Sequence, residues 1–160
     1  MTRYQVWFNY RMSAGQLNLY YQGRELDNTC KADPSCKDLK ETIAHIAWEC
    51  SHAQAIWQQV WTHWEGENHY DQRNVRQYVT SRQTPPPSQQ LIQRVQSMYG
   101  FFTDDHAKAL DSIWWIVTSV VTSLLWLRRN ERVFWHQHST TSECYANAKQ
   151  LYWYVEASPS

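Results

Sequence analysis

Three cysteines and one histidine lie close together in the first third of the chain. Cys30, Cys36, His45 and Cys50 fall within a window of 21 residues. Thiolates and neutral imidazoles are the side chains that bind tetrahedral zinc in proteins. A closed shell of four such ligands ties loops together and does not activate water. We therefore predict that these four residues form a structural zinc site.

The spacing of the four residues leaves alternatives open. Five residues separate Cys30 from Cys36, a wider gap than the two to four of most zinc sites. His52 is an alternative ligand. The competing interpretation is a set of reduced core cysteines, because free Cys is often buried, and we expect this for Cys144. A Cys30–Cys36 disulfide is a third interpretation, which is disfavoured because nothing marks the chain as secreted.

The residues around His45 also carry a family resemblance. The run Glu41-Thr-Ile-Ala-His-Ile-Ala-Trp-Glu-Cys-Ser-His-Ala-Gln-Ala-Ile-Trp57 has Glu-Thr before the histidine, two apolar residues and a cysteine after it, and Ala-x-x-Trp beyond. It resembles the zinc-binding region found downstream of the polymerase domain in non-LTR retrotransposon reverse transcriptases. The resemblance covers residues 5–65. A second segment, Leu124-Leu-Trp-Leu-Arg-Arg-Asn-Glu-Arg-Val-Phe134, is similar to the Trp-x-x-Arg-Asn segment that often follows in such elements.

The resemblance implies a function as well as a ligand set. It implies that Cys30, Cys36, His45 and Cys50 bind one zinc ion, with the Trp-rich helix that follows packed against the site. In the family this region lies beside the polymerase and is thought to help engage element RNA or target DNA during target-primed reverse transcription. We therefore expect a non-catalytic zinc-binding protein whose partner is RNA or DNA.

Two groups of basic residues are candidates for the nucleic-acid contacts. They are Lys31, Lys37 and Lys40 around the predicted zinc loop, and Arg128, Arg129 and Arg132 later in the chain. Acidic residues interrupt the lysines, and cations are also expected near a helix C-terminus for structural reasons. The chain has 15 Lys and Arg against 15 Asp and Glu. This balance is unlike that of proteins that hold phosphate backbones non-specifically, so any contact must be local.

A protein-interaction module is the competing class of function. The chain contains 10 Trp and 10 Tyr among 160 residues, and aromatic side chains are enriched at protein interfaces. In this interpretation the aromatic helices form a groove for a protein partner or a homodimer interface, and the metal site is degenerate. The chain would then be a domesticated or effector-like helical adaptor.

One acidic motif resembles a catalytic site. Phe102-Thr-Asp-Asp105 matches the aromatic-x-Asp-Asp signature of a reverse-transcriptase metal site, where paired carboxylates hold two metal ions. It lies on the wrong side of the zinc region for the family order, and no partner Asp on an upstream strand is evident. Negative side chains also suit a helix N-terminus. We therefore interpret the motif as a helix start.

The elements that must position these residues are predicted to be helices, in a mainly α fold with a small zinc-organised helical lobe followed by a helical bundle. Three consecutive prolines within residues 81–88 predict an extended linker between a zinc-binding domain at 1–80 and a helical lobe at 89–160. Apolar spacing predicts helices over 53–64, 71–79, 91–98, 103–128 and 144–155. Only residues 4–10 and 17–21 alternate as strands do.

The sequence predicts neither a signal peptide nor a membrane span. Met1–Arg11 has no apolar run of signal-peptide length, and the uncharged stretch 112–127 is shorter than the roughly 20 residues that a bilayer requires. We expect an intracellular chain without membrane contact, and the sequence does not distinguish nucleus from cytoplasm.

Overall fold

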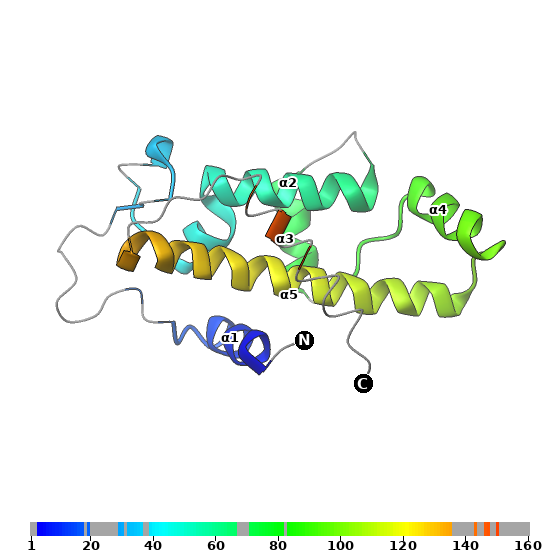
Figure 1. The fold of residues 1–160 in the computed structure, drawn as a ribbon, viewed down its shortest axis with the longest axis horizontal. Coiled ribbons are helices and arrows are strands. Elements are labelled where there is room, and N and C mark those ends of the chain that lie inside the picture. Colours follow the sequence, from blue (N-terminus) through cyan, green and yellow to red (C-terminus); the bar gives the residue numbers. More distant parts are fainter. Residues whose placement is uncertain are drawn as a thin grey trace. The chain divides into compact units, whose positions relative to one another are not determined.

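The computed structural model of the chain describes residues 3–17, 19, 29, 30, 32–36, 39–66, 71–81 and 83–135, together with 143, 146, 147 and 150. This part is mainly helical, as predicted (Figure 1). The helices are α1 (Arg3–Ser13), α2 (Ser51–Glu65), α3 (Gln72–Thr80), α4 (Gln89–Tyr99) and α5 (Asp104–Trp135). A 3₁₀ turn (Pro34–Cys36) and a π-helical turn (His45–Glu49) precede α2. Within the described residues, the extended pairing is one antiparallel bridge between Thr29 and Lys40.

The chain divides into two compact units, and each contains parts that are distant in the sequence. Unit 1 comprises Met1–Ile56 and Ser119–Ser160, and unit 2 comprises Trp57–Thr118. These bounds differ from the predicted domains at 1–80 and 89–160, because the predicted zinc segment shares a unit with the second half of α5. The predicted helix at 144–155 lies mostly outside the described residues.

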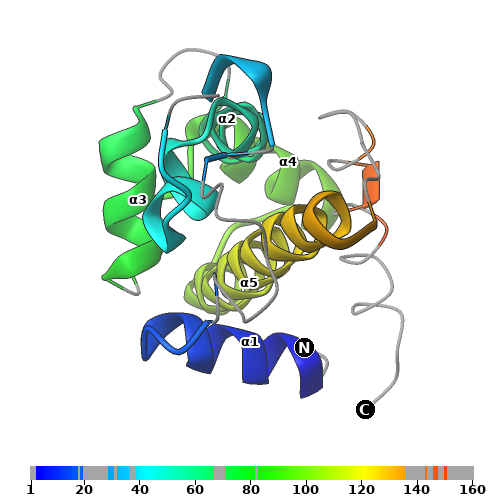
Figure 2. The ribbon, with the colours of Figure 1, turned by 90° about the vertical axis from the view of Figure 1, so that its left-hand side faces the viewer.

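Helix α1 corrects the prediction of strand alternation at 4–10. Gln5 and Phe8 are buried and recur at the helical spacing of i and i+3. The ring of Phe8 packs 6.1 Å from that of Trp126 on α5, and the hydroxyl of Thr122 donates to Oδ1 of Asn9. Both ribbon views show α1 beside α5 (Figure 2). Tertiary packing against α5 therefore selects the helical period over the local alternation.

Helix α5 is the longest element, with 32 residues. Asp104 and Asp105 occupy its first turn, which confirms the interpretation of the acidic motif as a helix start. The hydroxyls of buried Ser and Thr side chains donate to carbonyls three or four residues earlier in the helix, as Ser123 does to Ser119 at 2.8 Å. Such bonds satisfy polar groups inside an otherwise apolar helix.

The same helix is the one candidate membrane span within the described residues. Asp104–Phe134 is long and apolar enough to cross a bilayer by length and composition. However, 61% of its most apolar window is buried inside the protein. Burial of this extent is typical of a central core helix.

The core of unit 2 is built from tryptophans. Trp114 is fully buried, and its ring lies 6.1 Å from that of Trp61 and 5.0 Å from that of Trp64. The segment 83–88 joins α3 to α4 within this unit. Pro85 is buried, and its carbonyl accepts a hydrogen bond from the indole of Trp64 at 3.3 Å. The segment 83–88 therefore has neither helix nor strand, and through Pro85 it packs on the core of unit 2.

Candidate metal centre

The four predicted zinc ligands come together in unit 1. One possible ligand atom from each of Cys30, Cys36, His45 and Cys50 lies within 4.8 Å of all the others. Sγ of Cys50 lies 3.9 Å from Sγ of Cys30 and 4.0 Å from Sγ of Cys36. The sulfurs of an ideal tetrahedral site with Zn–S bonds of about 2.3 Å are about 3.8 Å apart. The cluster thus has the donor set and the dimensions of a tetrahedral metal site and can bind a metal ion.

Burial supports the same assignment. The four residues are between 2% and 5% exposed, which leaves the cluster closed to solvent. Among the described residues, Nε2 of His45 is a buried nitrogen without a hydrogen-bond partner. Leaving such an atom unsatisfied costs about 1–3 kcal/mol, a cost that a metal ion would remove. A pocket beside the cluster is lined by Cys30, His45 and Cys50. His52, the alternative ligand, also lines this pocket but is outside the four-residue group.

The wide gap between Cys30 and Cys36 is filled by a structured loop. Oδ1 of Asp33 accepts a hydrogen bond from the backbone N–H of Ser35 at 2.8 Å, and the 3₁₀ turn at Pro34–Cys36 follows directly. This turn presents the Cys36 thiol to the cluster. The hydroxyl of Ser35 lies 3.0 Å from that of Ser51 at the start of α2. The loop can therefore be longer than in most zinc sites and still bring its two cysteines together.

A π-helical turn brings His45 next to Cys50. The backbone N–H of Cys50 donates to the carbonyl of His45 at 2.8 Å, the i to i+5 bond that defines a π turn. At the start of this turn, Oγ1 of Thr42 accepts from the backbone N–H of His45 at 2.9 Å. The spacing of four residues between the histidine and the cysteine thus matches this turn. The threonine of the Glu-Thr motif thus supports the backbone at His45.

The cysteines perturb one another's pKa values. The pKa of the Cys30 thiol is lowered to about 5, chiefly because Cys50 donates a hydrogen bond to it, with a further contribution from the N–H of Ala32. The pKa of Cys50 is raised, because its proton is held by Cys30 and its side chain is buried. One thiolate is therefore formed at neutral pH without metal. A bound metal would displace the remaining thiol protons.

A buried ion pair joins the metal-binding segment to α5. Oε2 of Glu41 accepts hydrogen bonds from Nη2 of Arg129 at 2.7 Å and from its Nε at 3.1 Å, and both side chains are almost fully buried. The guanidinium also lies 5.2 Å from the ring centroid of Trp126 and donates to the carbonyl of Leu19 at 2.8 Å. Glu41 belongs to the first resembling segment and Arg129 to the second. The structure thus links two motifs that are 88 residues apart.

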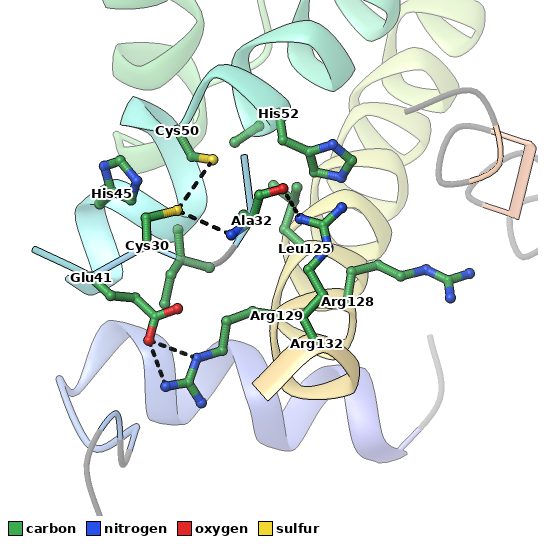
Figure 3. Close-up of a pocket in the computed structure, with 12 residues that line it drawn as sticks. Cys30, Ala32, Glu41, His45, Cys50, His52, Leu125, Arg128, Arg129 and Arg132 are labelled. Atoms are coloured by element: carbon green, nitrogen blue, oxygen red, sulfur yellow. Dashed lines mark hydrogen bonds and ion pairs between the residues drawn. The ribbon is translucent and has the colours of Figure 1, made fainter. Parts of the chain in front are cut away.

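The three arginines of α5 point in different directions (Figure 3). Arg129 reaches Glu41, whereas Arg132 donates to the backbone carbonyl of Ala32 in the metal-binding loop. Arg128 pairs with Glu131 of its own helix at 2.5 Å. Arg129 and Arg132 are 4% and 8% exposed. Both guanidiniums have partners inside unit 1, and their contacts with nucleic acid stay a prediction.

The structure describes one of the three lysines that were predicted to contact nucleic acid. Lys40 is exposed beside the loop, while Lys31 and Lys37 lie outside the described residues. The packing of the Trp-rich helix on the zinc site stays a prediction; Trp57, Trp61 and Trp64 belong to unit 2 and are buried there. His52 is buried, and its pKa is lowered to about 4 by burial first and then by the charges of Arg132 and Arg128.

Sequence reasoning missed the roles of Glu41, Arg129 and Arg132 in the site. A signal was present, since Glu41 and Arg129 both lie within resembling segments, but nothing local in the sequence pairs them. Comparisons with known protein families, with curated proteins and with solved structures give no significant match. The geometry of the cluster and the residues that surround it therefore carry the functional argument.

Proposed function

We propose that this protein is a non-catalytic module organised by one zinc ion and related to the region that follows the polymerase in non-LTR retrotransposon reverse transcriptases. The observation that carries the proposal is the buried Cys3His cluster, whose ligand atoms lie within 4.8 Å of one another. Three thiolates and an imidazole favour zinc over the harder divalent ions. When bound, zinc would hold the loop of Cys30 and Cys36 against the turn of His45 and Cys50.

A structural role for the metal follows from the burial of the ligands. Catalytic zinc keeps an open coordination position for water or substrate. Here four protein ligands complete the tetrahedral set, and all four are buried. This arrangement supports a non-catalytic function in which the metal stabilises the fold and the surrounding surface meets a partner.

Metal content is the first test. We expect about one zinc per chain, measured by mass spectrometry on protein purified without added metal, because the site offers one complete tetrahedral set. Cys50→Ser and His45→Ala should each lose it, whereas Ser97→Ala, at an exposed helix position outside the site, should retain it. Wild-type protein that is folded but free of zinc, cobalt and iron would contradict the proposal.

The nucleic-acid part of the proposal is supported by the resemblance and by the exposed Lys40 beside the loop. We expect a fluorescent single-stranded RNA to bind with an affinity that falls steeply as salt rises, because phosphate contacts release counterions. Lys40→Gln should reduce the salt slope by about one, and Lys108→Gln, a 76% exposed lysine of α5, is the control. Binding that is absent at low salt would contradict RNA contact.

A protein-interaction function is the second candidate, favoured by exposed apolar side chains on α1. Val6, Trp7 and Tyr10 are 53%, 50% and 66% exposed and recur at helical spacing. Exposed aromatic residues of this kind are common anchors at protein interfaces. These side chains lie on α1, whereas the tryptophans of α2, one of the aromatic helices expected to form the interface, are buried. Association that changes little with salt would favour this function over nucleic-acid binding.

A further inference from the structure

Cys30 is the ligand with the least local support. It lies in a loop between the bridge residue Thr29 and the 3₁₀ turn at Pro34–Cys36, whereas His45 and Cys50 are fixed by the hydrogen bond that closes the π turn. A loop of this kind loses conformational freedom when it is ordered, at a cost of about 1–2 kcal/mol per residue. Something other than local secondary structure must therefore hold Cys30 in place.

On the C-terminal side of Cys30, the support comes from Ala32. Its backbone N–H donates to Sγ of Cys30 at 3.3 Å, a contact that stabilises the thiolate. Its carbonyl accepts a hydrogen bond from Nη1 of Arg132, 100 residues later in the chain. Arg132 thus holds the residue that positions and solvates the thiolate.

The backbone N–H of Cys30 is held from the other side of the loop. It donates to the carbonyl of Leu39 at 2.9 Å, next to the bridge between Thr29 and Lys40. Glu41 follows immediately and is anchored to α5 by Arg129. The two segments that contact Cys30, one at Ala32 and one at residues 39–41, are therefore both bonded to α5.

We infer that Arg132 is a positioning residue of the metal centre, which acts through Ala32 to hold the Cys30 thiolate in place for the metal. The inference rests on the proposed metal binding. Groups that orient metal ligands without contacting the metal commonly contribute 10–100-fold to metal affinity. Arg132 supplies such support from a distant part of the sequence, and this explains how a wide Cys30 to Cys36 gap is compatible with a compact site.

Arg128 provides a matched control on the same helix. Arg128 and Arg132 both line the pocket beside the ligands, and replacing either with Met removes one positive charge. Arg128, however, pairs with Glu131 of its own helix and points away from the ligands (Figure 3). A general electrostatic effect would appear in both variants, whereas a positioning effect would appear only in Arg132→Met.

The test is zinc affinity measured by competition with a chromogenic chelator. We expect Arg132→Met to bind zinc about 10–100-fold more weakly than wild type and Arg128→Met to bind like wild type. Equal losses in both arginine variants, or an unchanged affinity in Arg132→Met, would overturn the inference.

Two further measurements separate the inference from folding and from the proposed function. Far-UV circular dichroism checks the fold of each variant, and Arg132→Gln, a residue of good helix propensity, replaces Arg132→Met if the latter fails to fold. With cobalt as the probe, Arg132→Met should lose part of the thiolate-to-metal charge-transfer absorption, and an unchanged spectrum would overturn the inference. Wild-type protein that takes up neither metal would instead refute the proposed function.

Discussion

Removal of zinc with a strong chelator is expected to unfold unit 1. The apparent binding free energy of structural zinc is about 10–16 kcal/mol in small zinc-binding peptides at neutral pH. Whole domains are stable by only about 5–15 kcal/mol. Without the metal, three buried cysteine side chains and the unsatisfied Nε2 of His45 would remain uncompensated inside unit 1. A metal bound to the cluster would therefore contribute a large share of the stability of this unit.

The measurement is thermal unfolding followed by circular dichroism, with and without chelator and after zinc is restored. We expect the midpoint to fall by tens of degrees on chelation, since about 1 kcal/mol corresponds to roughly 2–4 °C in a chain of this size. Restored zinc should reverse the change. His45→Ala, already lacking one ligand, is the control and should respond little to chelator. Wild-type curves that coincide with and without chelator would show that the cluster is not a stabilising metal site.

Arg129→Met is expected to be the most destabilising single change outside the metal ligands. It would leave the carboxylate of Glu41, which is 1% exposed, buried without its partner. Breaking a buried ion pair in this way typically costs about 3–5 kcal/mol. Equilibrium denaturation should therefore show a lower midpoint in the Arg129→Met variant with zinc present throughout.

Replacing both partners distinguishes the ion pair from a simple loss of packing. The Glu41→Leu, Arg129→Met double variant should recover part of the stability, because no buried charge is then left uncompensated. Recovery should be incomplete, since the carbonyl of Leu19 also loses its donor. Lys108→Met breaks the exposed pair with Asp105 on the same helix and should change stability by less than about 1 kcal/mol. A double variant no more stable than Arg129→Met would contradict the coupling.

The local features of this protein follow from the sequence. The ligand types of Cys30, Cys36, His45 and Cys50 predict a metal cluster, and the structure gathers them within 4.8 Å. The apolar spacing of residues 53–64 predicts α2, and Gly66, with a φ of 96°, ends it in the conformation that glycine adopts most readily. These features can be predicted because each depends on residues that lie close together in the sequence.

Only the tertiary structure decided which distant segments form one unit. Residues 4–10 alternate as a strand does, yet they form α1 because Phe8 packs on Trp126 of α5. The basic cluster of α5 has a spacing that also fits a phosphate-binding surface, yet Arg129 and Arg132 turn inward to Glu41 and Ala32. The physical reason is that a buried charge must find a partner wherever the fold provides one. Sequence spacing determines which residues share a turn, whereas the pairing of a carboxylate with a guanidinium 88 residues later depends on the packing of the whole unit.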